Sequence, residues 1–171
     1  NLYYKQGVYA QSGIMFEQAI GFWKRCGMGI SPEMADSIND LARLYAAQEK
    51  NEEAEEMFDQ ALNMRKQTLG TEHIDLSETL NDLADYLIDR DRYPEAEPLL
   101  VKALEIRELT FGPNHRQVAE TCHSLGNLYR ERDDFDTAED YFKRSFAIRE
   151  ILLGKNHPDW LLGGRLLNLG H

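Results

Sequence analysis

The sequence predicts an all-α fold in which antiparallel helix pairs stack on one another. The first observation behind this prediction is an internal repeat, because the segments that begin at Ile38, Leu80 and Cys122 align without a gap at a step of 42 residues. The second is a spacing of apolar residues by three and four within each repeat. The third is a composition of 42% hydrophobic residues with only five prolines, which favours a helical core.

The alignment of the repeats rests on four columns in which one residue type recurs. These are the leucines Leu41, Leu83 and Leu125, the small residues Ala54, Ala96 and Ala138, the arginines Arg65, Arg107 and Arg149, and the glycines Gly70, Gly112 and Gly154. Four such columns at one step indicate a true repeat.

Each repeat is predicted to contain two helices. The apolar stripe of the first helix in the first full repeat consists of Ile38, Leu41, Ala42 and Tyr45. A polar turn follows, and the stripe of the second helix consists of Ala54, Met57, Phe58, Ala61 and Leu62. We expect Gly70 to end the second helix, because glycine accepts the left-handed backbone of a helix C-terminus. Neither helix buries its stripe alone, so neighbouring pairs must share a core.

We interpret the whole chain, residues 1–171, as one array of such repeats. The predicted parts are a partial repeat at 1–30, full repeats at 31–72, 73–114 and 115–156, and a partial or degenerate helix at 157–171. Because the chain starts at Asn1 and within a predicted helix, we expect it to be a piece of a longer protein.

The repeats resemble tetratricopeptide (TPR) repeats. The motif Leu-Ala/Gly-x-x-Tyr followed by Ala-x-x-x-Phe occurs at Leu41 to Phe58 and again at Leu125 to Phe142. The ordinary TPR period is about 34 residues, whereas "ALEIRELTFGPNH" and "SFAIREILLGKNHPD" are similar to the longer repeats of kinesin light chains and nephrocystin-type proteins. The resemblance implies a right-handed superhelical solenoid of antiparallel helix pairs whose first helices line a concave groove.

Three histidines in register, His73, His115 and His157, raise the question of a metal site. Helices of successive repeats pack about 10 Å apart, whereas a zinc ion needs nitrogens within about 2.1 Å. The first full repeat has Ser31 followed by Pro32 at this position, a typical start of a helix. We therefore predict that this column caps the first helices, and that the chain has no metal and no cofactor.

The arginine column is predicted to be structural, because cations late in a helix suit its dipole and can pair with a glutamate of a neighbouring repeat, although a ligand contact is the alternative. No phosphate-binding loop, nucleophile motif or metal-ligand cluster occurs, so we predict that the chain is not an enzyme. A formal net charge of −11 opposes binding to nucleic acid or to an anionic membrane surface. The two cysteines, Cys26 and Cys122, lack a pairing motif, which favours the cytoplasm.

A partner protein is predicted to contact the first helices beside their apolar stripes. The predicted peptide-binding residues are Asp36, Asn39, Arg43, Glu78, Asn81, Asp85, Asp89, Glu120, His123, Asn127 and Arg130. Asn39 and Asn81 have both a donor and an acceptor for an extended peptide backbone, and we expect neither to belong to the apolar stripes. The excess of acidic residues predicts a neutral to basic partner segment.

The leading interpretation is therefore an adaptor or scaffold module. Two alternatives remain open at the level of sequence. In one, the array is a structural spacer that self-associates through its repeat ends, and in the other it is the regulatory arm of an enzyme domain outside this sequence.

Overall fold

The computed structural model describes residues 30–153 and seven residues before them. Those seven are residues 13, 15, 16, 18, 21, 22 and 25, and all are helical. Gly154, His157 and the predicted final segment 157–171 lie outside the described residues.

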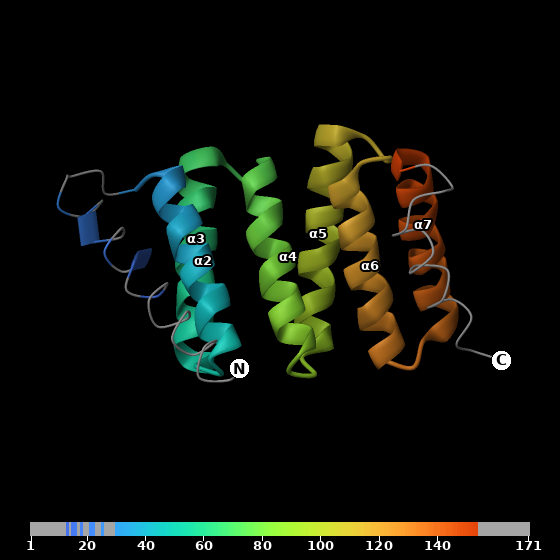
Figure 1. The fold of residues 1–171 in the computed structure, drawn as a ribbon, viewed down its shortest axis with the longest axis horizontal. Helices are drawn as coiled ribbons and strands as arrows, with labels where there is room; N and C mark the ends of the chain where they lie inside the picture. The colour runs from blue at the N-terminus through green and yellow to red at the C-terminus, as the bar shows by residue number, and fades with distance from the viewer. Residues whose placement is uncertain are drawn as a thin grey trace. The chain divides into compact units, whose positions relative to one another are not determined.

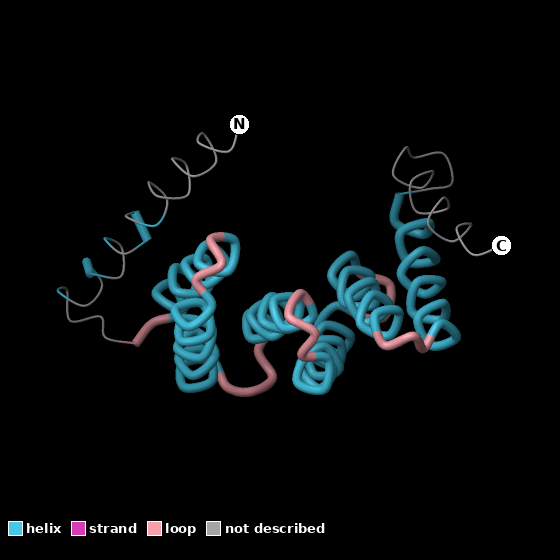
Figure 2. The backbone as a smooth tube through the Cα atoms, turned by 90° about the horizontal axis from the view of Figure 1, so that it is seen from below, coloured by secondary structure: helices cyan, strands magenta, loops and turns pink. Residues whose placement is uncertain are grey.

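Within residues 30–153 the chain forms six helices joined by short loops (Figure 1). They are α2 (Pro32–Ala47), α3 (Asn51–Leu69), α4 (Ile74–Ile88), α5 (Tyr93–Phe111), α6 (Arg116–Glu131) and α7 (Phe135–Leu153). The part of the chain that the structure describes contains no strand (Figure 2). The predicted all-α class is thus confirmed, with two helices in each full repeat. None of the described helices combines the length and the apolar character that crossing a membrane requires.

The chain divides into two compact units, Asn1–Leu83 and Ala84–His171. The boundary falls within α4, so unit 1 contains α2, α3 and the first ten residues of α4, Ile74 to Leu83. Unit 2 contains the rest of α4 together with α5, α6 and α7.

The first helices of the repeats begin with the side-chain caps that the sequence predicts. The Ser31 hydroxyl accepts a hydrogen bond from the backbone amide three residues later, at 3.2 Å, and Pro32 opens the helix. His73 and His115 each accept through Nδ1 from the amide two residues later, at 3.3 Å. Such caps satisfy amides that have no partner inside the helix. The capping role predicted for these two histidines is confirmed.

The turn between the two helices of a repeat has one geometry in all three described repeats. Glu49, Asp91 and Asp133 adopt positive φ angles of 61°, 59° and 60°. The amide of the next residue donates to the carbonyl five residues before it, at 3.0, 2.9 and 2.9 Å respectively. This is the hydrogen-bond pattern of a Schellman motif, in which the residue with the left-handed conformation is usually glycine. An acidic residue therefore stands in a left-handed conformation in every one of these turns.

The glycines after the second helices have a different geometry from the one expected. Gly70 has φ 88° and ψ 177°, and Gly112 has φ 80° and ψ 170°. Their φ is positive as predicted, but the extended ψ belongs to a region that glycine almost alone adopts, not to the left-handed helical region. The chain thus leaves each second helix in an extended direction toward the next cap.

Small residues let the two helices of a repeat approach closely. Ala42 and Ala54 are fully buried in unit 1, as is Ala96 in unit 2. At Gly126 in α6, an added Cβ atom would lie 2.6 Å from the ring of Phe142 in α7. Apolar side chains fill the remaining core, and in unit 1 Met34, Ile38 and Ala61 form one buried cluster. The aromatic side chain of Phe58 is buried, while those of Tyr45, Tyr129, Phe142 and Phe146 are half-buried.

Candidate functional site

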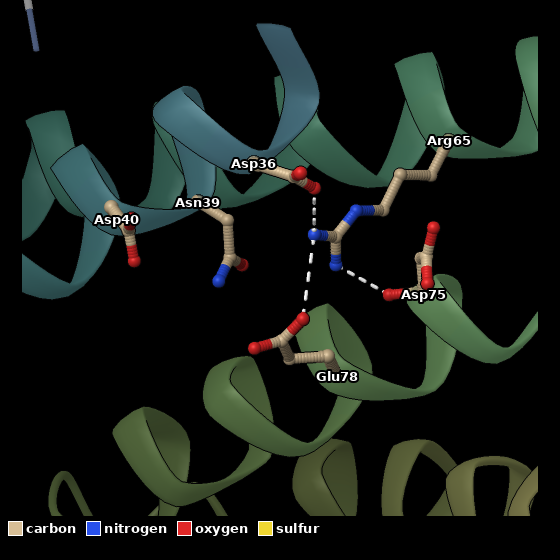
Figure 3. A pocket seen from close by; sticks show the side chains of 6 residues that line it. All are labelled: Asp36, Asn39, Asp40, Arg65, Asp75 and Glu78. Atoms are coloured by element: carbon tan, nitrogen blue, oxygen red, sulfur yellow. Dashed lines mark hydrogen bonds and ion pairs between the residues drawn. The ribbon is translucent and has the colours of Figure 1, made fainter. Parts of the chain in front are cut away.

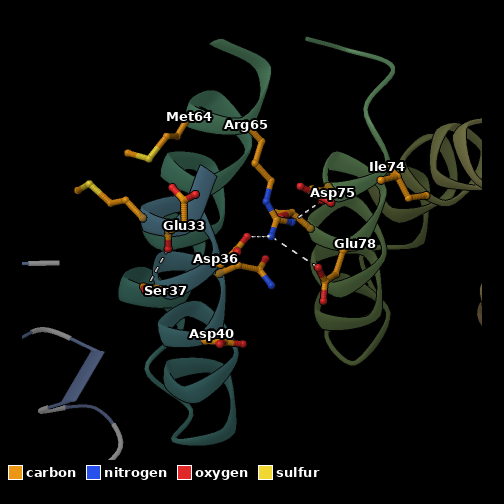
Figure 4. A network of polar contacts seen from close by, with 12 residues as sticks. Glu33, Asp36, Ser37, Asp40, Met64, Arg65, Ile74, Asp75 and Glu78 are labelled. Carbon is orange, nitrogen blue, oxygen red and sulfur yellow. Dashed lines mark hydrogen bonds and ion pairs between the residues drawn. The ribbon is translucent and has the colours of Figure 1, made fainter. Parts of the chain in front are cut away.

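The polar centre of unit 1 is the guanidinium of Arg65, which α3 places between α2 and α4 (Figure 4). The side chain is only 2% exposed. Its Nη1 donates to the Asp75 carbonyl and, at 2.6 Å, to the Thr79 hydroxyl. Its Nη2 donates to Asp36 at 2.6 Å and lies 3.6 Å from a carboxylate oxygen of Glu78. The predicted pairing of this arginine with a glutamate of the next repeat is confirmed.

The same arrangement recurs in unit 2 at Arg107. Its Nη1 donates to the Gln117 carbonyl at 3.1 Å and to the Thr121 hydroxyl at 2.6 Å. Arg149, the third member of the column, is exposed. The structural role predicted for this column therefore holds for its first two members, whose guanidinium groups fasten a second helix to the helix that follows it.

A polar hollow of about 270 Å³ lies beside Arg65 (Figure 3). The residues that line it come from α2, α3 and α4, and they are Asp36, Asn39, Asp40, Arg65, Asp75 and Glu78. We call this cavity the Arg65 hollow. It brings together three of the predicted binding residues, namely Asp36, Asn39 and Glu78.

Asn39 is nearly enclosed, with 2% of its surface exposed. Its Nδ2 donates to Asp82 at 2.8 Å, while its buried Oδ1 accepts no hydrogen bond from the residues that the structure describes. Asn81, the equivalent residue of the next repeat, is 8% exposed. The expectation that both asparagines lie outside the packed stripes therefore needs correction. They sit where the packed stripe meets the polar face, and Asn39 also links α2 to α4.

The carboxylates around the hollow are partly buried and close to one another. Burial raises the pKa of Glu78. The positive charge of Arg65 lowers this pKa, and the negative charges of Asp82, Asp36 and Asp40 raise it further. Burial likewise raises the pKa of Asp40, with Arg43 acting in the opposite direction. In both groups the effect of burial therefore outweighs that of the nearby arginine.

Arg43, another predicted binding residue, borders this cluster from the surface. Its side chain is 58% exposed and lies 3.7 Å from carboxylate oxygens of both Asp40 and Asp82. Exposed pairs at this distance contribute little to stability. Arg43 is thus available to a partner as well as to its neighbours.

The predicted binding residues of unit 2 differ from one another in exposure. Asp85, Asp89 and Arg130 are exposed, while Glu120, His123 and Asn127 are half-buried. Glu120 accepts from Arg116 at 2.9 Å, and Arg130 pairs with Glu131 at 2.7 Å. The His123 ring lies 5.3 Å from that of Phe142, and burial lowers the pKa of His123, with Arg149 and Arg130 adding to the effect.

Sequence reasoning missed Asp40, Asp75 and Asp82 as members of the site. A signal was present, because Asp40 follows Asp36 by four residues and Asp82 follows Glu78 by four residues. Residues four apart share one face of a helix. The acidic pairs therefore marked the same surface on two successive first helices. Among the residues that the structure describes, no group of three or more histidine, cysteine or carboxylate side chains has a geometry that could hold a metal ion.

Comparison with known protein families agrees with this architecture. The family described as the tetratricopeptide repeat matches residues 1–67, 33–108 and 75–151 of the chain. The second and third matches start 42 residues apart, at the step of the internal repeat. The chain belongs to the tetratricopeptide repeat family. TPR repeats are scaffold modules that mediate protein–protein interaction, without catalytic activity of their own.

Solved structures share the TPR fold of this chain. BtubC (BKLC) from P. vanneervenii superposes with a TM-score of 0.83 at 24% identity, over 97% of this chain and 66% of that one. A protein from Podosopora anserina, described as a putative kinesin light chain with nearly identical TPR-like repeats, gives a TM-score of 0.78 at 24% identity, over 96% of this chain and 78% of that one. The kinesin light chain-like character predicted from the sequence is thereby confirmed at the level of the fold.

A domain of a third protein has a similar fold. The N-terminal domain of stress-induced protein-1 from C. elegans has a TM-score of 0.58 at 19% identity, over 80% of this chain and 95% of that domain. A sequence search of curated proteins gave no significant match. The chain spans 66% of the length of BtubC.

Proposed function

We propose that this TPR chain is an adaptor module that holds a segment of a partner protein against the first helices of its repeats, α2, α4 and α6. The observation that supports this most directly is the Arg65 hollow, which opens among polar side chains of α2, α3 and α4. The hollow contains a buried acceptor without a hydrogen-bond partner, Oδ1 of Asn39, which carries a cost that a bound donor would remove.

The chemistry of these helices favours a neutral to basic segment. Asp36 and Glu78 present carboxylates in unit 1 with more than half of each side chain exposed, at 59% and 54%. Asp85 and Asp89 are exposed in unit 2. Together with the net charge of −11, these groups repel acidic segments and attract basic ones over the range of a Debye length, about 8 Å at physiological salt. We place this binding in the cytoplasm, which the absence of a paired-cysteine motif fits.

Selection from a displayed library of random peptides tests the proposal and does not require an identified partner. We expect the selected peptides to be neutral or basic, and to bind a variant with Asp85→Lys and Asp89→Lys about tenfold more weakly at low salt, because two attractive charges become repulsive. The loss should shrink at high salt.

Matched changes on the second helices control for non-specific charge effects. Lys66 of α3 is exposed, and Lys102 of α5 lies 3.4 Å from its helix neighbour Glu105. Replacing both lysines with glutamate should leave peptide affinity within about twofold, since exposed pairs of this kind contribute little. If these changes abolish binding while the α4 changes leave it intact, the second helices carry the function and the proposal is wrong.

A further inference from the structure

We propose that the Arg65 hollow binds one cationic side chain, the ammonium of a lysine or the guanidinium of an arginine, from the bound segment. This inference rests on the proposed function and narrows it to one pocket and one chemical class. It is carried by three features of unit 1, namely an unpaired acceptor, an excess of carboxylates over guanidinium groups in the lining, and a suitable volume.

The unpaired acceptor is the side-chain oxygen of Asn39. In Figure 3 the Asn39 amide points from α2 into the space bordered by Arg65 and Glu78. Its Nδ2 is fixed by Asp82 at 2.8 Å, which leaves Oδ1 to accept from a donor. A buried acceptor without a partner costs about 1–3 kcal/mol. A ligand that donates hydrogen bonds would remove this cost on binding.

The charge around the hollow specifies a positively charged donor. Four carboxylates, those of Asp36, Asp40, Asp75 and Glu78, line it together with one guanidinium. That guanidinium donates to Asp36, to the Asp75 carbonyl and to Thr79, and lies 3.6 Å from a carboxylate oxygen of Glu78. Asp40 and Glu78 remain with about half of each side chain open, at 47% and 54%. A second cation placed between them would restore the balance of charge.

The size of the hollow agrees with a side-chain terminus. Its volume is about 270 Å³, and about 10–15 Å³ on the same measure is enough to hold one water molecule. An alkylammonium or alkylguanidinium group therefore fits together with a few waters. Lysine and arginine can also lay their apolar stems along the wall while the charged end reaches the carboxylates.

The first test uses small probes and needs no partner. The side-chain amide signal of Asn39 is followed by NMR in the full chain during titration with N-acetyl-lysine methylamide, N-acetyl-arginine methylamide and the uncharged N-acetyl-norleucine methylamide. We expect saturable shifts with the lysine or the arginine probe and none with norleucine. Equal shifts with all three probes, or no shift with any, would overturn the inference.

The second test is a double-mutant cycle on a library-selected peptide. One arm changes its basic residue to norleucine, and the other changes Asp40→Asn, which removes a charge and keeps the shape of the side chain. We expect each single change to weaken binding about tenfold, the value of one charge-assisted hydrogen bond, and the double change to add little more. Asp59→Asn is the matched control, because Asp59 is exposed on α3 and does not line the hollow.

The two tests separate this inference from the proposed function. If selected peptides lose affinity for the chain with the Asp85 and Asp89 changes but not with Asp40→Asn, the adaptor function stands. The Arg65 hollow then does not bind a cationic side chain of the peptide. If the probes bind the hollow but the peptides ignore the first helices, the adaptor function as proposed fails while the cation pocket stands.

Discussion

The guanidinium of Arg107 in α5 donates a hydrogen bond to the hydroxyl of Thr121 in α6 at 2.6 Å. Arg65 and Thr79 form the same bond at the same length in unit 1. Each bond joins the second helix of one repeat to the first helix of the next. Both arginines are buried, so these contacts belong to the fold, and the Arg65 contact also positions the walls of the Arg65 hollow.

Replacing Arg107 with methionine should destabilise unit 2 by about 1–3 kcal/mol, because the change leaves the Thr121 hydroxyl and the Gln117 carbonyl without their charged donor. Arg107→Lys should recover only part of the loss, since one ammonium does not reproduce the planar fork of the guanidinium. Urea denaturation measures both effects. Lys102→Met in the same helix should change stability by less than about 0.5 kcal/mol, and a comparable loss there would contradict the assignment.

Because the acidic residues in the turns adopt positive φ angles, we expect their replacement by glycine to increase the free energy of unfolding. Glu49→Gly should stabilise unit 1 by about 0.5–1 kcal/mol, because a left-handed L-residue costs about 1–2 kcal/mol and the added chain entropy of glycine offsets part of the gain. Asp91→Gly should gain less, since aspartate tolerates this conformation better. Glu49→Ala is the control for the lost side chain. Thermal melts in which the alanine variant matches the glycine variant would rule out a backbone cause.

The arrangement of helices was predictable from the sequence because it follows from local rules. The stripe through Ile38 and Leu41 sets the buried face of α2, and Ser31 sets its start. The stripe lies within α2 itself and Ser31 directly precedes it, so neither signal depends on residues far away in the sequence. The same reasoning placed His115 as a cap from its register alone.

The candidate site was only partly predictable, because it depends on packing between repeats. Asp36 and Glu78 could be assigned to the surface from their helix register. The burial of Asn39 and its hydrogen bond to Asp82 could not, since Asp82 lies on α4, 43 positions later in the chain. For the same reason the sequence did not show that Arg65 would border a hollow instead of lying along the outside of α3.

The close approach of α6 and α7 at Gly126 predicts coupling between two side chains. Gly126→Ala places a Cβ atom within 2.6–2.9 Å of three ring atoms of Phe142, and overpacking of this kind costs about 1–3 kcal/mol. With the ring removed by Phe142→Ala, the same change should instead stabilise by about 1 kcal/mol through helix propensity. A double-mutant cycle from urea denaturation measures the coupling. Additive effects would show that the ring moves aside without cost.

The half-buried His123 predicts that the stability of unit 2 depends on pH. Burial lowers the pKa of His123 below its usual 6.5, with Arg149 and Arg130 adding to the effect, so the folded chain binds this proton less readily than the unfolded chain. The contribution is therefore fully present above pH 6.5 and is lost as the pH falls from 6.5 through the lowered folded pKa. Free energies of unfolding measured between pH 5 and 8, a range set by the ordinary histidine pKa of about 6.5, should rise with pH more steeply in the native chain than in His123→Gln. Arg130→Gln should lie between the two, because it removes one of the repelling charges. Identical slopes for the native chain and His123→Gln would show that this ring titrates as it does in the unfolded state.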